Sequence, residues 1–224
     1  AKPSVTSYLD KNIEIGKVYK YTVRAYNSDA KSSYTSTSQI VYLNTPKVAV
    51  ANAKGGVQVN WNAIDGASGY AVYRSRNVDG HWTSWEKLLT VGTAVKTYLD
   101  YTAVSGEIYR YTVRAVNGVS KSGYVASNTL FYLAEPTVKI SNTKTGVYVK
   151  WTQAGGATGY TVYRSQYNVS TKKWSAWKNM GTAKATKLAW TDKSAQNNAA
   201  YKYTVRAVNQ NVRSSYTATP TLVY

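Results

Sequence analysis

The sequence predicts an all-β protein built from tandem antiparallel β-sandwiches. The first observation is a repeat: Tyr-Thr-Val-Arg-Ala begins at Tyr21, Tyr111 and Tyr203, which gives periods of 90 and 92 residues. The second is alternation of apolar and polar residues within the repeat, the spacing of a strand with one buried face. The third is punctuation by turn signals such as Lys54-Gly55-Gly56, with no window of helical periodicity between them.

The repeats divide the 224 residues into two complete units and one half unit. A second block, Gly-Tyr-x-Val-Tyr-Arg-Ser, occurs only at 69–75 and 159–165, between successive copies of the first block. Residues 45–133 and 134–224 therefore each form a complete repeat. Residues 1–44 match only the C-terminal half of one.

Each complete unit offers six or seven short strands in order along the chain. Early strands are predicted where Val57-x-Val59-x-Trp61 and its counterpart 147–151 alternate with polar residues. The Gly-Tyr block supplies the next strand, a Trp-x-x-Trp pair follows it, and the Tyr-Thr-Val-Arg-Ala block supplies a late strand. Short strands separated by such turns are typical of a β-sandwich.

These blocks, in this order, resemble the fibronectin type III domain, an immunoglobulin-like fold, as found along secreted and surface proteins of Gram-positive bacteria. Pro46 and Pro136 match its first strand, and Trp61 and Trp151 match the core tryptophan of its second. The resemblance implies an extracellular location and no general catalytic residues. It also implies that the tyrosines at 19, 109 and 201 form a corner, each phenol bonded to the backbone just upstream.

Composition argues against an enzyme. The chain has no cysteine and one histidine, which excludes a disulfide framework, a thiolate metal site and a His-clustered metal site. Asp10, Asp100 and Asp192 recur one unit apart, so we expect them to cap turns rather than form a catalytic pair. We predict no cofactor and no metal. No apolar run reaches the length needed to cross a bilayer, so we expect no membrane insertion.

The excess of 28 Lys and Arg over 10 Asp and Glu gives a net charge of +18, which favours anionic partners. The polar face of the Tyr-Thr-Val-Arg-Ala strand is basic in every copy, and Tyr73 or Tyr163 is expected on the same face. These cations and rings could form a structural ladder. They could also bind an anionic cell-wall polymer or glycan through several weak contacts. No nucleic-acid-binding motif is present, so nucleic acid is not expected. The candidate polyanion-binding residues are Lys20, Arg24, Arg110, Arg114, Lys202 and Arg206.

Each complete unit carries a Trp-x-x-Trp pair, Trp82 with Trp85 and Trp174 with Trp177. Residues three apart on a strand point to opposite faces, so one member should face outward. We expect Trp82 and Trp174 to do so. They could stack on sugar rings together with Tyr73 and Tyr163, the alternative function, or they could cover the edge of their own sandwich.

Residues 1–44 contain late strands but no early ones. Alone they would expose an apolar face and open strand edges. We therefore expect this half repeat to be completed from outside the chain, by the missing strands of a preceding unit or by a second chain.

Overall fold

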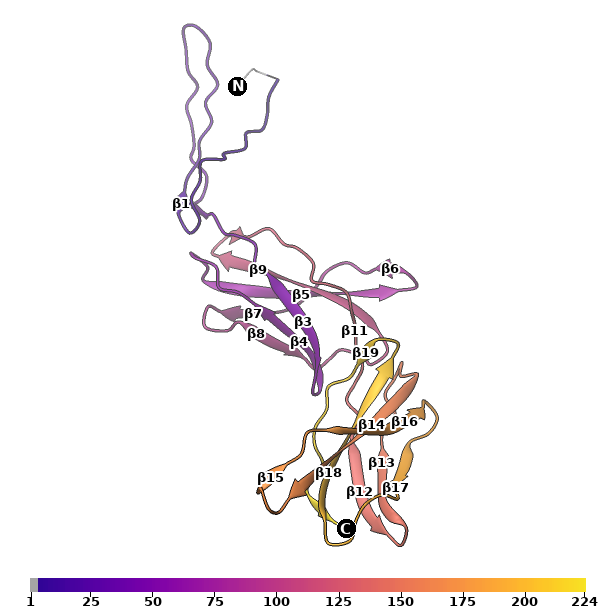
Figure 1. Ribbon diagram of the computed structural model, residues 1–224. Coiled ribbons are helices and arrows are strands. Elements are labelled where there is room, and N and C mark those ends of the chain that lie inside the picture. The colour runs from indigo at the N-terminus through magenta and orange to yellow at the C-terminus, as the bar shows by residue number, and fades with distance from the viewer. Residues whose placement is uncertain (1–3) are drawn as a thin grey trace.

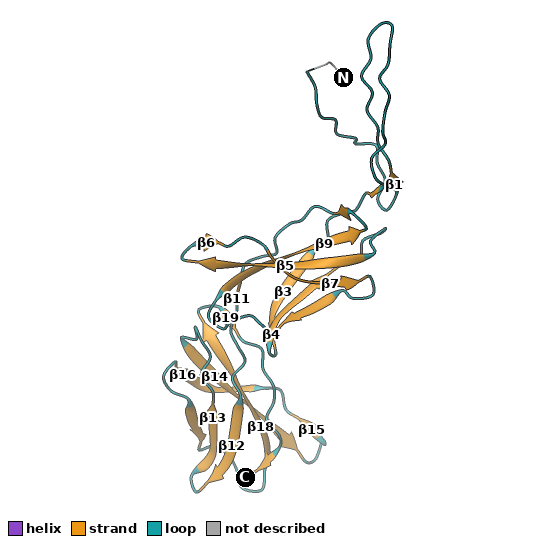
Figure 2. Cartoon of the chain, turned by 180° about the vertical axis from the view of Figure 1, so that it is seen from behind, coloured by secondary structure: helices purple, strands orange, loops and turns teal. Residues whose placement is uncertain are grey.

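The computed structural model describes residues 4–224 and confirms the all-β class (Figure 1). Two sandwiches follow one another end to end, and an N-terminal hairpin projects from the first (Figures 1 and 2). Every strand pairing is antiparallel. Among the residues described, no helix is long and apolar enough to cross a membrane.

Each complete unit packs a three-stranded sheet against a larger one. In the first unit the three-stranded sheet has the order β3-β4-β8, and the larger sheet centres on β5 and β9. The strands of the first unit, from both sheets, are β3 (Val48–Ala53), β4 (Gly56–Trp61), β5 (Gly69–Val78), β6 (His81–Trp82), β7 (Glu86–Gly92), β8 (Thr97–Asp100), β9 (Ile108–Asn117), β10 (Ser120–Lys121) and β11 (Leu130–Phe131).

The second unit repeats this arrangement, with the order β12-β13-β17 in the smaller sheet and with β14 and β18 at the centre of the larger. Its strands are β12 (Val138–Thr143), β13 (Gly146–Trp151), β14 (Gly159–Asn168), β15 (Lys173–Trp174), β16 (Lys178–Lys184), β17 (Ala189–Asp192), β18 (Ala200–Asn209), β19 (Val212–Arg213) and β20 (Leu222–Val223). This is the fibronectin type III-like sandwich that the sequence blocks predict.

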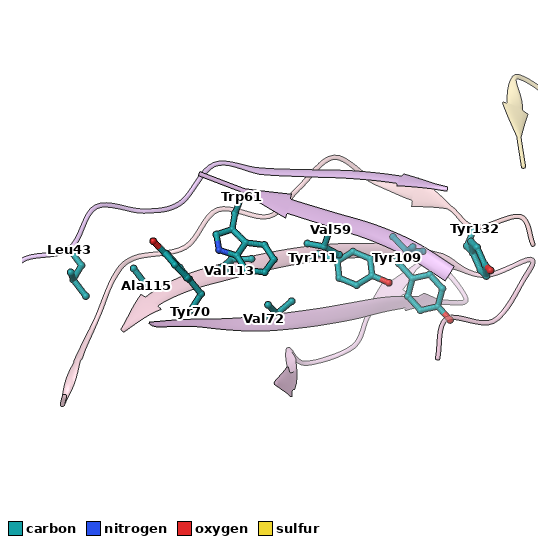
Figure 3. Close-up of a cluster of buried hydrophobic side chains, with 11 residues drawn as sticks. Leu43, Val59, Trp61, Tyr70, Val72, Tyr109, Tyr111, Val113, Ala115 and Tyr132 are labelled. Carbon is teal, nitrogen blue, oxygen red and sulfur yellow. The ribbon is translucent and has the colours of Figure 1, made fainter. Parts of the chain in front are cut away.

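The core lies between the two sheets and follows the alternation in the sequence (Figure 3). Val59 and Trp61 of β4 share one buried cluster with Tyr70 and Val72 of β5 and with the odd-numbered residues 109–115 of β9. Val72 lies opposite Val113 in the β5–β9 register, which brings two buried side chains of the larger sheet together. Burial of these apolar residues is the main force that closes the sandwich.

The expected tyrosine corner is present in all three copies. The hydroxyl of Tyr109 accepts a hydrogen bond from the backbone N–H of Val104 at 3.0 Å. Tyr201 and Tyr19 make the same bond, at 2.9 and 2.8 Å. Each bond ties the loop before the strand to the strand itself.

The N-terminal hairpin pairs only β1 (Val18–Tyr19) with β2 (Ile40–Val41) as regular strands. Val23 of this hairpin is 88% exposed, whereas its counterpart Val113 is fully buried. The segment between β1 and β2 stands away from both sandwiches (Figure 2). How this half repeat is completed stays a prediction.

Candidate functional site

The candidate site is the outer face of each larger sheet, where cationic and aromatic side chains alternate. In the first unit β9 contributes Arg110, Thr112 and Arg114, and Tyr73 of β5 lies opposite Thr112 in the register. In the second unit β18 and β14 place Lys202, Thr204, Arg206 and Tyr163 in the same way. We call this surface the ladder face.

At one end of the ladder face the cations lie against tryptophan rings. The guanidinium carbon of Arg110 lies 4.3 Å from the ring centre of Trp82 and 5.0 Å from that of Trp85. The Nε atom of Arg110 is buried and has no hydrogen-bond partner. Lys202 lies 4.4 Å from the ring of Trp174. These contacts make Arg110 and Lys202 part of the sandwich's own surface packing.

This arrangement corrects the expectation that Trp82 and Trp174 alone face outward. All four tryptophans of the two pairs are half-buried. Strand β6 ends at Trp82 and β7 begins at Glu86, so residues 83–85 between them do not belong to a strand. The alternation rule does not apply across that break, and both rings of the first pair contact Arg110.

At the other end of the ladder face each complete unit has a small open pocket. In the first unit the pocket has a volume of about 170 Å³, and in the second about 130 Å³. Trp85 and Tyr124 meet edge to face at 5.9 Å, and Trp177 and Tyr216 do so at 6.0 Å. The first pocket is lined by Tyr73, Trp85, Thr112, Arg114 and Tyr124, and the second by Tyr163, Trp177, Thr204, Arg206 and Tyr216.

The arginine of each pocket is held in a fixed orientation. The Nε of Arg114 donates to the carbonyl oxygen of Ser122 at 2.7 Å, and its guanidinium lies 5.7 Å from the ring centre of Tyr124. Arg206 makes the same two contacts: its Nε donates to the carbonyl of Ser214 at 2.7 Å, and its guanidinium lies 5.5 Å from the ring centre of Tyr216. None of the ion pairs among residues 4–224 includes either arginine. Each pocket thus contains a positive charge with no carboxylate to balance it.

The N-terminal half repeat has only part of this site. Lys20 and Arg24 are exposed. The Nε of Arg24 donates to the carbonyl of Ser32 at 2.8 Å, and its guanidinium lies 5.3 Å from the ring of Tyr34. Residues 4–44 contain no tryptophan, so the pocket wall that Trp85 and Trp177 provide is missing there.

Two of the pocket tyrosines, Tyr124 and Tyr216, were not predicted, although the sequence carries a signal for them. A tyrosine follows the strand arginine by ten residues in every copy: Tyr34, Tyr124 and Tyr216. A serine two residues before each tyrosine accepts the Nε bond described above. The repeated pattern Ser-x-Tyr therefore marks the segment that covers the ladder face.

The recurring aspartates cap turns, as predicted. Asp100 accepts from the backbone N–H of Thr102 at 3.0 Å, and Asp192 accepts from that of Ser194 at 2.9 Å. Asp10 accepts from the N–H of Asn12 at 2.9 Å. Their turn-capping role is confirmed in all three copies.

In the complete units the same carboxylates also receive buried side-chain bonds that the sequence did not reveal. Arg164 lies 2.7 Å from Asp192, and the hydroxyl of Tyr203 donates to it at 2.8 Å. Burial alone would raise the pKa of Asp192, but hydrogen bonds from Ser194, Tyr203 and Arg164 outweigh burial and lower it. Burial and the nearby carboxylate raise the pKa of Tyr203 well above its usual value. The carboxylate is therefore a structural anion.

The other residues that could act in catalysis or metal binding do not form a second site among residues 4–224. His81 is exposed, and its ring Nδ1 forms a hydrogen bond with the carbonyl of Asp79 rather than with another side chain. Within residues 4–224, no group of three or more His, Cys, Asp or Glu side chains is placed to hold a metal ion. The ladder face, with its two pockets, is thus the candidate site.

No protein-family model matches the chain. A Kelch domain-containing protein of Sulfurisphaera tokodaii is 29% identical over 165 residues, covering 71% of this chain and 21% of that protein. Exoglucanase B of Cellulomonas fimi is 24% identical over 241 residues, covering 92% and 20%. Amylopullulanase of Thermoanaerobacterium saccharolyticum is 30% identical over 95 residues, covering 42% and 7%. The chain thus spans about a fifth of the first two proteins and less of the third.

Among solved structures, a two-domain fibronectin type III segment of chicken tenascin is 13% identical, with a TM-score of 0.39, over 81% of this chain and 100% of that one. The chicken interferon gamma receptor alpha chain is 10% identical, with a TM-score of 0.45, over 80% and 97%. The strand order described above gives each complete unit a fibronectin type III-like fold.

Proposed function

We propose that this chain is a non-catalytic repeat segment of an extracellular bacterial surface protein, that it spaces and presents neighbouring modules, and that it adheres weakly to anionic polymers. The observation that carries the adhesion is the pocket repeated in both complete units. In each pocket an oriented arginine without a carboxylate partner stands among aromatic walls.

The four candidate cations of the complete units differ in accessibility. Arg110 and Lys202 are covered by tryptophan rings, which makes them poor partners for a polymer. Arg114 and Arg206 line the pockets, and only their Nε atoms have a hydrogen-bond acceptor. A guanidinium has five N–H donors, so donors remain for a carboxylate or phosphate of a ligand.

The pockets suit a repeating ligand better than an isolated small molecule. Volumes of about 170 and 130 Å³ fall below the range of roughly 300–1,000 Å³ typical of small-molecule sites. Weak binding at each pocket can add along a polymer, because the second contact benefits from a high effective concentration. The net charge of +18 favours the approach of an anionic chain.

A spacing role rests on the arrangement of the units and on the size of the relatives. The sandwiches lie end to end (Figure 1). The similar segments of the Kelch domain-containing protein and exoglucanase B make up 21% and 20% of those proteins.

The carboxylates Asp100 and Asp192 are buried in separate units and engaged by capping bonds, so they are not available for acid–base chemistry.

The test is retention on immobilised polygalacturonate, an anionic sugar polymer, at low and at physiological salt. We expect retention to weaken as salt rises, because exposed charges are screened over about 8–10 Å at physiological ionic strength. The double variant Arg114→Ser, Arg206→Ser should be retained much less than the parent. The control Lys54→Ser, Lys144→Ser removes the same charge from exposed turns outside the pockets. Equal losses in the two double variants, or retention independent of salt, would refute the proposal.

A second candidate is binding of neutral carbohydrate, favoured by the aromatic pocket walls and by similarity to proteins named as an exoglucanase and an amylopullulanase. In this second candidate the stacking rings would be Tyr73 and Tyr163 with Trp85 and Trp177, which line the pockets. Fully methyl-esterified polygalacturonate keeps the sugar rings and removes the charge. Retention on that polymer, lost in a Trp85→Ala, Trp177→Ala variant, would favour this second function.

A further inference from the structure

Successive units meet through glycine. Gly106, in the loop before β9, packs against Gly156, in the loop before β14 of the next unit. The N-terminal half repeat meets the first complete unit in the same way, through Gly16 and Gly66. We call these two contacts the glycine joints.

The contact is between backbones and leaves no room for a side chain. A Cβ atom added to Gly156 would collide with the Cα of Gly106 and would lie 2.9 Å from Cζ of Phe131. A Cβ atom added to Gly106 would lie 3.0 Å from the backbone nitrogen of Gly156. At the other joint, a Cβ atom on Gly66 would collide with the Cα of Gly16.

Hydrogen bonds hold both sides of each joint. The hydroxyl of Ser105 donates to the carbonyl of Gly155 in the next unit at 2.7 Å and accepts from the linker N–H of Ala134 at 2.9 Å. The carbonyl of Gly156 accepts from Asn209 of its own unit at 2.7 Å. At the first joint, Asn117 makes the same bond to Gly66, also at 2.7 Å.

The second unit shows that this glycine is not needed for backbone conformation alone. Gly16 and Gly106 have positive φ, and each N–H donates to a linker carbonyl, Tyr42 or Tyr132. The equivalent residue in the second unit is Asn198, with φ of 61° and the same bond to Tyr224. Asparagine tolerates this conformation. Glycine stands at this position in both loops that the structure places against another unit.

We infer that the glycine joint is a docking surface between repeats and that it fixes one relative orientation of neighbouring units. Its partner is a following repeat of the same kind whose loop carries glycine at the position of Gly66 and Gly156. The same contact occurs at both joints, so the chain applies one docking rule twice. This inference goes beyond the proposed adhesion and does not depend on any ligand.

The test measures the distance between two spin labels across the second joint in the full chain. The protein has no cysteine, so Lys87→Cys and Asn179→Cys, at exposed positions of β7 and β16, give a single labelled pair. The perturbation is Gly156→Ala. Its matched control is Gly55→Ala, because Gly55 has φ of +77° against +74° for Gly156 but nothing within 4 Å of an added Cβ. The two variants therefore carry similar backbone strain and differ in the collision across the joint.

We expect a narrow distance distribution in the parent and in Gly55→Ala, and a broadened or displaced one in Gly156→Ala. Ser105→Ala leaves the backbone intact and removes only the bridging hydroxyl, so it gives a reading even if Gly156→Ala folds poorly. Ser105→Ala should also broaden or displace the distance distribution, but less than Gly156→Ala does. A broad distribution in the parent would overturn the inference. So would parent-like distributions in both Gly156→Ala and Ser105→Ala.

Discussion

The buried hydrogen bond from Tyr203 to Asp192 should contribute measurably to the stability of the second unit. The donor hydroxyl lies 2.8 Å from a carboxylate that is 1% exposed, and the tyrosine is fully buried. The substitution Tyr203→Phe removes this hydroxyl and keeps the ring. A hydrogen bond to a charged group contributes about 1.5–3 kcal/mol, so we expect a loss of about 2 kcal/mol.

Native-state hydrogen exchange of the β18 amides measures this loss within one unit. About 2 kcal/mol corresponds to roughly a 30-fold increase in exchange rate, since 1.4 kcal/mol is tenfold. The control is Tyr111→Phe, which removes the equivalent 2.8 Å bond to Asp100 in the first unit. It should accelerate exchange in β9 and leave β18 at the parent rate. Exchange in β18 that is unchanged by Tyr203→Phe would refute the assignment of a stabilising role to this bond.

Three further predictions concern the charge, the ladder face and the half repeat. Because the fold lowers the pKa of Asp192, the ionised carboxylate stabilises the folded state above its unfolded pKa near 3.9, and this stabilisation is lost as pH falls through the folded pKa. The urea midpoint of unfolding should therefore drop below about pH 4, and it should drop by less in Asp192→Asn. Arg110→Met should cost the first unit about 1 kcal/mol in urea unfolding, and Lys202→Met should cost the second unit less, because Lys202 covers one ring and Arg110 two. We propose that early strands from outside the chain complete the sandwich of residues 4–44. Joining a copy of residues 45–93 ahead of residue 4 should then slow amide exchange at Val23. Fast exchange at Val23 that is unchanged by this addition would contradict the proposal.

The strands and the core were predictable because burial on one face imposes a period of two on the sequence. Tyr109, Tyr111 and Val113 are buried on β9 as the alternation indicates. The aspartate caps were also predictable, because a capping bond is local and joins residues two apart.

The contacts that depend on three-dimensional pairing were not predictable in this way. The fold brings Arg74 to 3.0 Å from Asp100, which is 26 residues away in the sequence. The expectation that Trp82 alone of its pair faces outward was wrong, because the alternation rule was carried across residues 83–85, which are not in a strand. Both rings of the pair lie against Arg110 on the outer face. The glycine joints depend on how two folded units dock, and no pattern within one unit encodes that.

Contact between an anionic polymer and the pockets can be observed through the indole N–H signals of the tryptophans. Titration with a short oligogalacturonate at low salt should shift the signals of Trp85 and Trp177, which line the two pockets. The signals of Trp61 and Trp151, which are buried in the cores, should stay in place. The shifts should disappear in the Arg114→Ser, Arg206→Ser variant. Shifts that spread over all the tryptophans, or that persist in that variant, would show that the polymer does not bind through the arginines of the pockets.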